Sequence, residues 1–336
     1  MLTYLLLTER CNLKCSHCIR GERRHRDMSM EDFTCAVDEV LSVYPMSSFV
    51  LTGGEPTLNP EFECMLAYAL KTCKAEIIVN SNGTTSFYEN IGHYTDFKKL
   101  HIQFSIDGTP IEHDRIRGIG AFGKVERNIT RLRKSGVRLW VSTVVTEANL
   151  ESIFELRDML VDYNVEKWHV NPVLPFGCGA KLGLVPVEKW NALVDELIET
   201  TPFRLGIKKL YDFSSIENCK SEEFKLLVAS AKGKHYCNCG SGNRKLYVYP
   251  DLAVYGCTCL KDFPFGNLGR EPLSTILESD IAKRIRCYCL EESSPCQRCE
   301  YLPVCNGGCI GMSYHEFGRL GVGDIRCPKF RNLSCG

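Results

Sequence analysis

The chain lacks an excess of charge of either sign, and it lacks a hydrophobic run long enough to cross a membrane. Its 336 residues hold 41 Lys and Arg against 41 Asp and Glu, so the formal net charge is zero. No surface for a nucleic acid or another long polyanion is indicated. The apolar residues 1–7 are few, and neither a basic leader nor a small-residue cleavage site accompanies them. These absences predict a cytoplasmic globular protein with no nucleic-acid partner and no membrane partner.

Cysteine, in contrast, is plentiful. The 20 cysteines are about 6% of the chain, which is below the level of a small disulfide scaffold. They gather at short spacings, and such clusters favour metal ligation in a reducing compartment over disulfide bonding. With 44% hydrophobic residues, the chain can bury a large core without disulfides.

Short apolar runs alternate with longer amphipathic stretches from residue 1 to about 200. This rhythm predicts an α/β fold built from repeated strand-helix units around a parallel sheet. The candidate strands are residues 3–7, 48–51, 76–80, 99–105, 138–145 and 167–173. The candidate helices are residues 29–43 with Ser29 as the cap, 60–72, 123–134, 149–163 and 186–199.

The first group of thiols is Cys11, Cys15 and Cys18, with three and then two residues between them. A structural zinc site is closed by four protein ligands. A 4Fe-4S cluster held by three thiolates instead keeps one iron free for a ligand that is not protein. The triad therefore points to reactive cluster chemistry, with a partial zinc site as the competing interpretation.

Two further segments follow predicted strands. In Leu-Thr-Gly-Gly-Glu-Pro, residues 51–56, two glycines let the backbone approach a ligand and Glu55 offers an anion suited to an ammonium group. In Ile-Gln-Phe-Ser-Ile-Asp-Gly, residues 102–108, a buried strand ends in polar groups. Together with Cys-Asn-Leu-Lys-Cys-Ser-His-Cys at residues 11–18, these segments resemble the radical S-adenosylmethionine (SAM) enzymes.

This resemblance implies a partial, TIM-like (β/α)6 barrel in which SAM chelates the free iron of a 4Fe-4S cluster. Ligands of such barrels gather at the carboxyl ends of the strands. By analogy, Gly53, Gly54, Glu55 and Pro56 bind the SAM amino group. Ser105 contacts the SAM carboxylate, and Arg127 ranks ahead of Arg117 as its guanidinium partner.

Four other residues are candidate site residues on the same analogy. His17 occupies a position that lies beside the adenine in the family, with simple packing as the alternative. Asn82 and Asp107 are candidate ribose contacts, although both also suit turns. Cys178 follows the last predicted strand and is a candidate hydrogen-atom or proton donor, with burial as a small apolar residue as its other interpretation.

After roughly residue 235 the helical periodicity fades and a second group of cysteines appears. They are Cys239, Cys257, Cys296, Cys299, Cys305, Cys309 and Cys327. This pattern resembles the seven-cysteine SPASM domain, which carries one or two auxiliary 4Fe-4S clusters. A zinc ribbon is the competing interpretation of cysteines two residues apart. The family usually has glycine where Leu252 stands, so the turn before Cys257 must be made differently.

The analogy also implies the ligand sets. One auxiliary cluster is held by Cys296, Cys299, Cys305 and Cys327, and the other by Cys239, Cys257 and Cys309. The fourth ligand of the cluster held by Cys239, Cys257 and Cys309 is not determined. It is Cys237, Cys219 or no protein group at all. An open iron in that cluster would be able to take a substrate thiolate or amide.

The resemblance implies three segments: a radical SAM core at 1–205, a bridging segment at 206–235 and a SPASM domain at 236–336. The leading hypothesis is a maturase that installs a thioether or carbon-carbon crosslink, or a related modification, on a ribosomally made peptide or a protein. Alternatives are a dehydrogenase or epimerase of a small metabolite or peptide residue, an electron carrier, and an anaerobic sulfatase maturase. The last is disfavoured because those enzymes generally have aspartate where Thr258 stands. Expected partners are the peptide, a flavodoxin- or ferredoxin-type reductant and a separate leader-peptide-binding protein.

Overall fold

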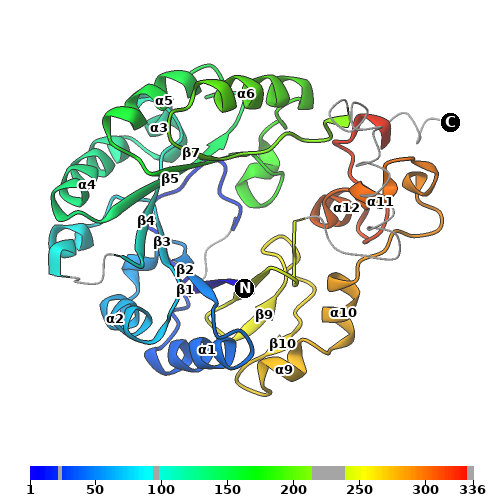
Figure 1. The fold of residues 1–336 in the computed structure, drawn as a ribbon, viewed down its shortest axis with the longest axis horizontal. Helices are drawn as coiled ribbons and strands as arrows, with labels where there is room; N and C mark the ends of the chain where they lie inside the picture. Colours follow the sequence, from blue (N-terminus) through cyan, green and yellow to red (C-terminus); the bar gives the residue numbers. More distant parts are fainter. Residues whose placement is uncertain (22–24, 94–97, 214–238, 331–336) are drawn as a thin grey trace. The chain divides into compact units, whose positions relative to one another are not determined.

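The computed structural model describes residues 1–21, 25–93, 98–213 and 239–330 (Figure 1). The chain divides into two compact units. The barrel unit consists of Met1–Pro186, Ala192–Lys208 and Val248–Leu252. The cysteine-rich unit consists of Val187–Asn191, Lys209–Tyr247 and Ala253–Gly336.

Seven neighbouring strands of the barrel unit are all parallel and follow the order of the sequence. They are β1 (Leu2–Thr8), β2 (Ser48–Gly53), β3 (Ile77–Ser81), β4 (Leu100–Ser105), β5 (Arg138–Val145), β6 (Lys167–Pro172) and β7 (Arg204–Gly206). The first six confirm the six predicted strands, and β7 was not anticipated. The α/β fold with a parallel sheet is therefore confirmed.

Helices lie along the outer side of this curved sheet (Figure 1). They are α1 (Met30–Val43), α2 (Phe62–Thr72), α3 (Pro110–Arg117), α4 (Ala121–Ser135), α5 (Ile153–Asp162) and α6 (Val187–Thr200), with the 3-10 turns η1 (Pro56–Leu58), η2 (Ser86–His93) and η3 (Gly177–Lys181). Ser29 caps α1 as expected, because its side chain accepts a hydrogen bond from the Asp32 N–H at 3.1 Å. The short helix α3 is an addition to the predicted set.

The two faces of the sheet differ in chemistry. Residues that alternate along a strand lie on opposite faces, and residues paired in register share a face. One face carries Leu5, Leu51, Val79, Ile102 and Val141, all fully buried. Burial of this apolar face against the core of the unit stabilises the strands.

The opposite face is mixed: Val50, Ile78 and Trp140 pack together on it, and polar side chains follow toward the carboxyl ends of the strands. Ser105, Ser142 and His169 are paired in register across β4, β5 and β6, and all three are only half-buried. The concave face of the sheet therefore presents accessible polar groups from neighbouring strands.

The cysteine-rich unit has short elements. These are β8 (Lys245–Val248), most of which belongs to this unit, β9 (Ala253–Tyr255), β10 (Gly266–Asn267), α9 (Leu273–Ile276), α10 (Asp280–Arg286), η4 (Pro295–Arg298), α11 (Leu302–Cys305) and α12 (Ile310–Phe317). Strands β9 and β10 pair antiparallel. Helices of four to eight residues are not stable alone, so tertiary contacts or metal must hold this unit.

The turn before β9 is made by Leu252 itself. Its φ is 64°, and its N–H donates to the Tyr249 carbonyl at 2.9 Å. A left-handed conformation costs a side-chain-bearing residue about 1–2 kcal/mol, and burial of the Leu252 side chain offsets that cost. Leu252 thus takes a left-handed backbone conformation of the kind that glycine adopts readily.

In the part of the chain that the structure describes, no helix combines the length and the apolar character that crossing a membrane requires.

Candidate active site and metal centres

The loop after β1 carries the first three cysteines, and hydrogen-bond donors lie near the sulfur atoms of Cys11 and Cys15. The Leu13 N–H lies 3.5 Å from Cys11 Sγ, and Asn82 Nδ2 lies 3.7 Å from the same atom. Arg117 Nη1 lies 3.9 Å from Cys15 Sγ. Burial raises the pKa of the Cys15 thiol, and the Arg117 charge opposes that rise. Such donors stabilise thiolate ligands and tune the potential of an iron-sulfur cluster.

The Gly53-Gly54 turn lies against this cysteine loop. The Gly54 N–H donates to the Thr8 carbonyl at 2.7 Å, and the Glu55 N–H donates to the Arg10 carbonyl at 2.8 Å. A Cβ on Gly53 would stand 2.3 Å from the Thr8 oxygen, and one on Gly54 would stand 2.1 Å from the Arg10 oxygen. Only glycine permits this approach, so the pair holds the turn at the base of the cysteine loop.

Glu55 is fully buried, and four donors engage its carboxylate. They are the Thr57 N–H at 3.3 Å, the Thr57 hydroxyl at 2.7 Å, the Ser81 hydroxyl at 2.8 Å and the Asn82 N–H at 2.7 Å. Burial nevertheless raises the pKa of this carboxyl. Glu55 therefore ties the ends of β2 and β3 together. Sequence reasoning missed a second feature of this turn, the 2.8 Å hydrogen bond from Arg20 Nε to the Gly53 carbonyl.

A buried ionic triad joins the cysteine loop to β4 and α3. Asp107 Oδ2 lies 2.6 Å from His17 Nε2 and 2.6 Å from Arg117 Nε. Its other oxygen accepts from the Val144 N–H at 2.9 Å. Burial alone would raise the pKa of Asp107, but the Arg117 charge and then His17 outweigh it and lower that pKa. Asp107 thus positions His17 and Arg117 at the cysteine loop.

The other candidate SAM contacts lie in different surroundings. Ser105 ends β4 and is half-buried, whereas Arg127 is exposed on α4. Asn82 follows β3, and its Nδ2 donates to Asn12 Oδ1 at 2.8 Å. The structure therefore brings Arg117 and Asn82 to the cysteine loop and leaves Arg127 on an exposed helix position.

Cys178 lies in η3, the turn after β6, which packs against the same loop. The Cys178 N–H donates to the Cys18 carbonyl at 2.8 Å. Gly177 has φ 59°, and a Cβ there would stand 2.5 Å from the Cys18 oxygen. The half-buried Cys178 is therefore held beside the cysteine loop through its backbone.

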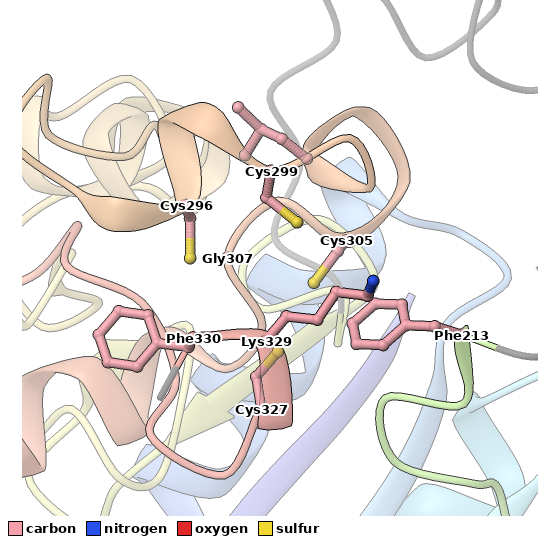
Figure 2. A pocket seen from close by; sticks show the side chains of 9 residues that line it. Phe213, Cys296, Cys299, Cys305, Gly307, Cys327, Lys329 and Phe330 are labelled. Atoms are coloured by element: carbon pink, nitrogen blue, oxygen red, sulfur yellow. The ribbon is translucent and has the colours of Figure 1, made fainter. Parts of the chain in front are cut away.

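In the cysteine-rich unit, four cysteines surround one pocket of about 320 Å³, open solvent at its mouth included. They are Cys296, Cys299, Cys305 and Cys327, and Figure 2 shows their sulfur atoms turned toward a shared space. Burial raises the pKa of Cys296 to about 11 and that of Cys305 to about 12. These thiols must lose their protons on binding metal.

The wall of this pocket is apolar and aromatic apart from one cation. Phe213, Leu302 and Phe330 line it, and the Lys329 chain crosses it (Figure 2). Lys329 Nζ lies 4.7 Å from the centre of the Tyr301 ring. An apolar wall limits water around a bound cluster, and a nearby cation raises its reduction potential.

The remaining predicted ligands belong to a second group of thiols. The pKa of Cys257 is raised, first by hydrogen bonding with the Cys259 side chain and then by burial. Burial raises the pKa of Cys309 to about 11. The charge of the Cys239 thiolate adds to the rise of both pKa values. Cys237 and Cys219 lie outside the described residues. Sequence reasoning overlooked Cys259, although its spacing from Cys257 was visible.

A buried aspartate connects the two groups of ligands. Asp324 Oδ2 accepts from Cys309 N–H at 3.1 Å, and the Asp324 carbonyl accepts from Cys327 N–H at 3.0 Å. Arg326 Nη2 pairs with the same carboxylate at 2.7 Å, and the Tyr211 hydroxyl also donates to it. Asp324 thus fixes the positions of one predicted ligand from each group, Cys309 and Cys327.

Within the described residues, no three Cys, His, Asp or Glu side chains gather closely enough to hold a single metal ion. The donor chemistry nevertheless fits 4Fe-4S clusters. Four thiols are spread around a pocket (Figure 2), and backbone N–H groups donate to the sulfurs of Cys305, Cys309 and Cys327. All-thiol donor sets with N–H groups directed at sulfur are what such clusters require.

Comparisons with known proteins agree with this geometry. The model of the Radical SAM superfamily matches residues 5–160, and that of the SPASM iron-sulfur cluster-binding domain matches residues 237–300. The antilisterial bacteriocin subtilosin biosynthesis protein AlbA of Bacillus subtilis (strain 168) is 25% identical, over 94% of this chain and 69% of AlbA. The AdoMet-dependent heme synthase of Methanosarcina barkeri (strain Fusaro / DSM 804) is 26% identical, over 93% of this chain and 91% of the synthase.

Among solved structures, Streptococcus suis SuiB bound to S-adenosylmethionine has the same fold. The TM-score is 0.77 at 16% identity, with 97% of this chain and 77% of SuiB covered. Because the two family models match separate stretches of the chain, residues 5–160 and residues 237–300, the chain carries a radical SAM domain followed by a SPASM iron-sulfur cluster-binding domain.

Proposed function

We propose that this radical SAM enzyme modifies a ribosomally synthesised peptide or a protein, by a thioether or carbon-carbon crosslink or a related oxidation. The observation that carries the proposal is the meeting of the cysteine loop with the ends of β1 to β4. Arg117, Asn82 and the Gly53-Gly54 turn all reach that loop. The cofactors are 4Fe-4S clusters and SAM.

When bound, the reduced cluster and SAM together supply a 5'-deoxyadenosyl radical that abstracts a hydrogen atom from the substrate. The residues of this chain hold and orient these groups. Cys11, Cys15 and Cys18 hold the SAM-binding cluster. The turn at Gly53–Pro56 offers backbone carbonyls to the SAM ammonium, and the fully engaged Glu55 fixes that turn.

The SAM carboxylate is assigned to Ser105 and Arg117. Arg117 is preferred over Arg127 because it is buried and 3.9 Å from Cys15 Sγ, whereas Arg127 is exposed. A guanidinium already paired with Asp107 is held in place for two-point binding of a carboxylate. His17, held by Asp107, is assigned to the adenine, and Asn82 to the ribose. Cys178, beside Cys18, remains the proposed donor of a hydrogen atom or proton.

The concave face of the sheet supports a peptide substrate. Beside Ser105 this face presents Ser142 and His169. Two residues farther along β6, it also presents the exposed Asn171. Hydroxyl, amide and imidazole groups pair well with the N–H and C=O groups of a peptide backbone. AlbA is named for the biosynthesis of a bacteriocin, and SuiB has been solved bound to its precursor peptide SuiA.

The second candidate is a small-metabolite substrate, because a heme synthase is also a relative. A tetrapyrrole with carboxylate side chains would require cations on the concave face. Lys167 and Arg204, which share that face, lie at the other end of their strands, beside Glu166. The hydroxyl and imidazole groups of Ser105, Ser142 and His169 at the carboxyl ends therefore favour the peptide.

We also propose a cytoplasmic location, a flavodoxin- or ferredoxin-type reductant and a separate leader-peptide-binding protein. A one-electron donor is necessary because 4Fe-4S clusters are reduced by one electron at a time.

The test is anaerobic incubation of the reconstituted protein with SAM and dithionite, followed by measurement of 5'-deoxyadenosine, iron and sulfide. The expected result is 5'-deoxyadenosine together with about eight to twelve irons per chain, for two or three clusters. Cys15→Ala should abolish the product while the auxiliary iron stays bound, and exposed Cys64→Ala should change neither. Unchanged 5'-deoxyadenosine in Cys15→Ala would contradict the mechanism. Short peptides encoded beside the gene then serve as substrates, and the product is identified by its mass change.

A further inference from the structure

A second thiol lies within the turn that holds Cys257. The Cys257-Thr258-Cys259 turn follows β9. The Leu260 N–H donates a hydrogen bond to the Cys257 carbonyl oxygen at 3.2 Å and so closes the turn. The Cys259 N–H donates to Cys257 Sγ at 3.4 Å. Cys259 is therefore in direct contact with a predicted cluster ligand.

The other two ligands of this group lie close by. The Cys239 thiol interacts electrostatically with both Cys257 and Cys309. Cys309 precedes α12, and its N–H is fixed on Asp324 at 3.1 Å. Cys259 thus adjoins Cys257, one of the three thiols that the resemblance assigns to one auxiliary cluster.

We infer that Cys259 is the fourth protein ligand of the auxiliary cluster held by Cys239, Cys257 and Cys309. This inference rests on the proposed function, because it assumes that the cluster forms. Cys237 is two residues from Cys239, just as Cys259 is two residues from Cys257, so spacing in the sequence does not separate these two candidates. Cys259 is preferred because its N–H contacts Cys257 Sγ at 3.4 Å within the turn that holds this ligand. On binding, each thiol loses its proton to solvent and its sulfur takes one iron.

Closure by Cys259 has a consequence for the reaction. A cluster with four protein ligands has no iron free for a substrate thiolate or amide. Such a cluster serves to pass electrons and to hold the unit together, so the peptide must be positioned by other groups.

The inference is tested on the full chain with the variants Cys259→Ser, Cys237→Ser and Cys219→Ser, and with exposed Cys287→Ser as the matched control. SAM is added first to fill the open iron of the SAM-binding cluster. The readouts are iron per chain, the electron paramagnetic resonance spectrum of the reduced protein, and its response to 2-mercaptoethanol as a thiolate probe.

We expect Cys259→Ser alone to lose about one iron per chain or to acquire a spectrum that responds to the probe. The inference is overturned if Cys259→Ser matches the parent chain, if Cys237→Ser or Cys219→Ser shows the change instead, or if the parent chain already responds to the probe. Cys259→Asp restores a ligating side chain, so an unresponsive four-iron cluster in that variant supports ligation even where Cys259→Ser folds poorly.

Failure of the proposed function gives a different pattern. In that case the parent chain forms no 5'-deoxyadenosine or binds zinc in place of iron. If the parent chain instead forms 5'-deoxyadenosine normally and the spectrum of Cys259→Ser is unaltered, only the assignment of Cys259 as a ligand is contradicted.

Discussion

Asp107, Glu55 and His113 are fully buried polar residues at the site end of the barrel, and each is stabilised in a different way. Asp107 stays ionised because Arg117 and His17 contact it. Glu55 is held by four hydrogen bonds, but burial outweighs them and raises its pKa. His113 accepts the Asp107 N–H at 3.3 Å on Nδ1, while its Nε2 has no hydrogen-bond partner. The last arrangement disfavours the charged form of the ring.

His113 should make the stability of the protein depend on pH. Burial, and then the Arg117 charge, lower its pKa to about 4, against about 6.5 in an unfolded chain. As the pH falls below about 6.5 the unfolded chain takes up a proton first, so folding stability is lost between about pH 6.5 and pH 4. The full loss is about 3 kcal/mol. His113→Asn keeps an acceptor for the Asp107 N–H and should remove most of this loss.

The measurement is anaerobic urea unfolding at pH 7.0 and pH 5.5 for the parent chain, His113→Asn and the exposed control His93→Asn. The free energy of unfolding should fall less between the two pH values in His113→Asn than in the other two. Equal losses in all three chains would show that His113 is not the titrating group.

At the scale of elements, the site is built where the turns after neighbouring strands touch. Turn η3 follows β6 and the cysteine loop follows β1, yet they are bonded through the Cys178 N–H and the Cys18 carbonyl. This backbone contact requires glycine at residue 177, because φ is positive there and a Cβ would overlap the Cys18 oxygen. The geometry of Cys18, the last proposed ligand of the SAM-binding cluster, thus depends on a turn far away in the sequence.

Gly177→Ala should therefore damage the SAM-binding cluster selectively. The added Cβ would have to displace the Cys18 carbonyl, so we expect about four of about twelve irons to be lost and 5'-deoxyadenosine to fall at least about tenfold. Gly183→Ala is the matched control, since a Cβ there meets only the end of the Glu147 side chain at 3.5 Å. Retention of all iron in Gly177→Ala would show that the two turns separate without consequence.

The sequence predicts the six long strands and five of the helices because their apolar residues repeat at clear intervals. It does not predict β7, which is three residues long, or α3, whose residues are mostly polar. The same limit applies to the site. Cysteine spacing and the Gly53-Gly54 pair are visible in one dimension. The position of Arg117 beside Cys15 depends on the register of α3, which only the fold determines.

At the scale of the whole molecule, the two units differ in what holds them. The barrel unit has a large aliphatic core behind its sheet. The core of the cysteine-rich unit includes two of the proposed ligands, since Cys296 and Cys327 pack with Val322 and Phe330. Its described helices have at most eight residues. Metal ligation must therefore supply much of its stability.

Removal of iron should consequently unfold the cysteine-rich unit before the barrel. We expect oxidation and chelation to speed tryptic cleavage at Arg284 and Arg298 by at least about tenfold, which corresponds to about 1.4 kcal/mol of local stability. Cleavage at Arg138, where β5 begins, should change little. Cys15→Ala, which affects only the SAM-binding cluster, is the control and should keep both auxiliary-domain sites protected. Mass spectrometry of the fragments measures each rate, and equal acceleration at all three arginines would mean that the clusters stabilise both units alike.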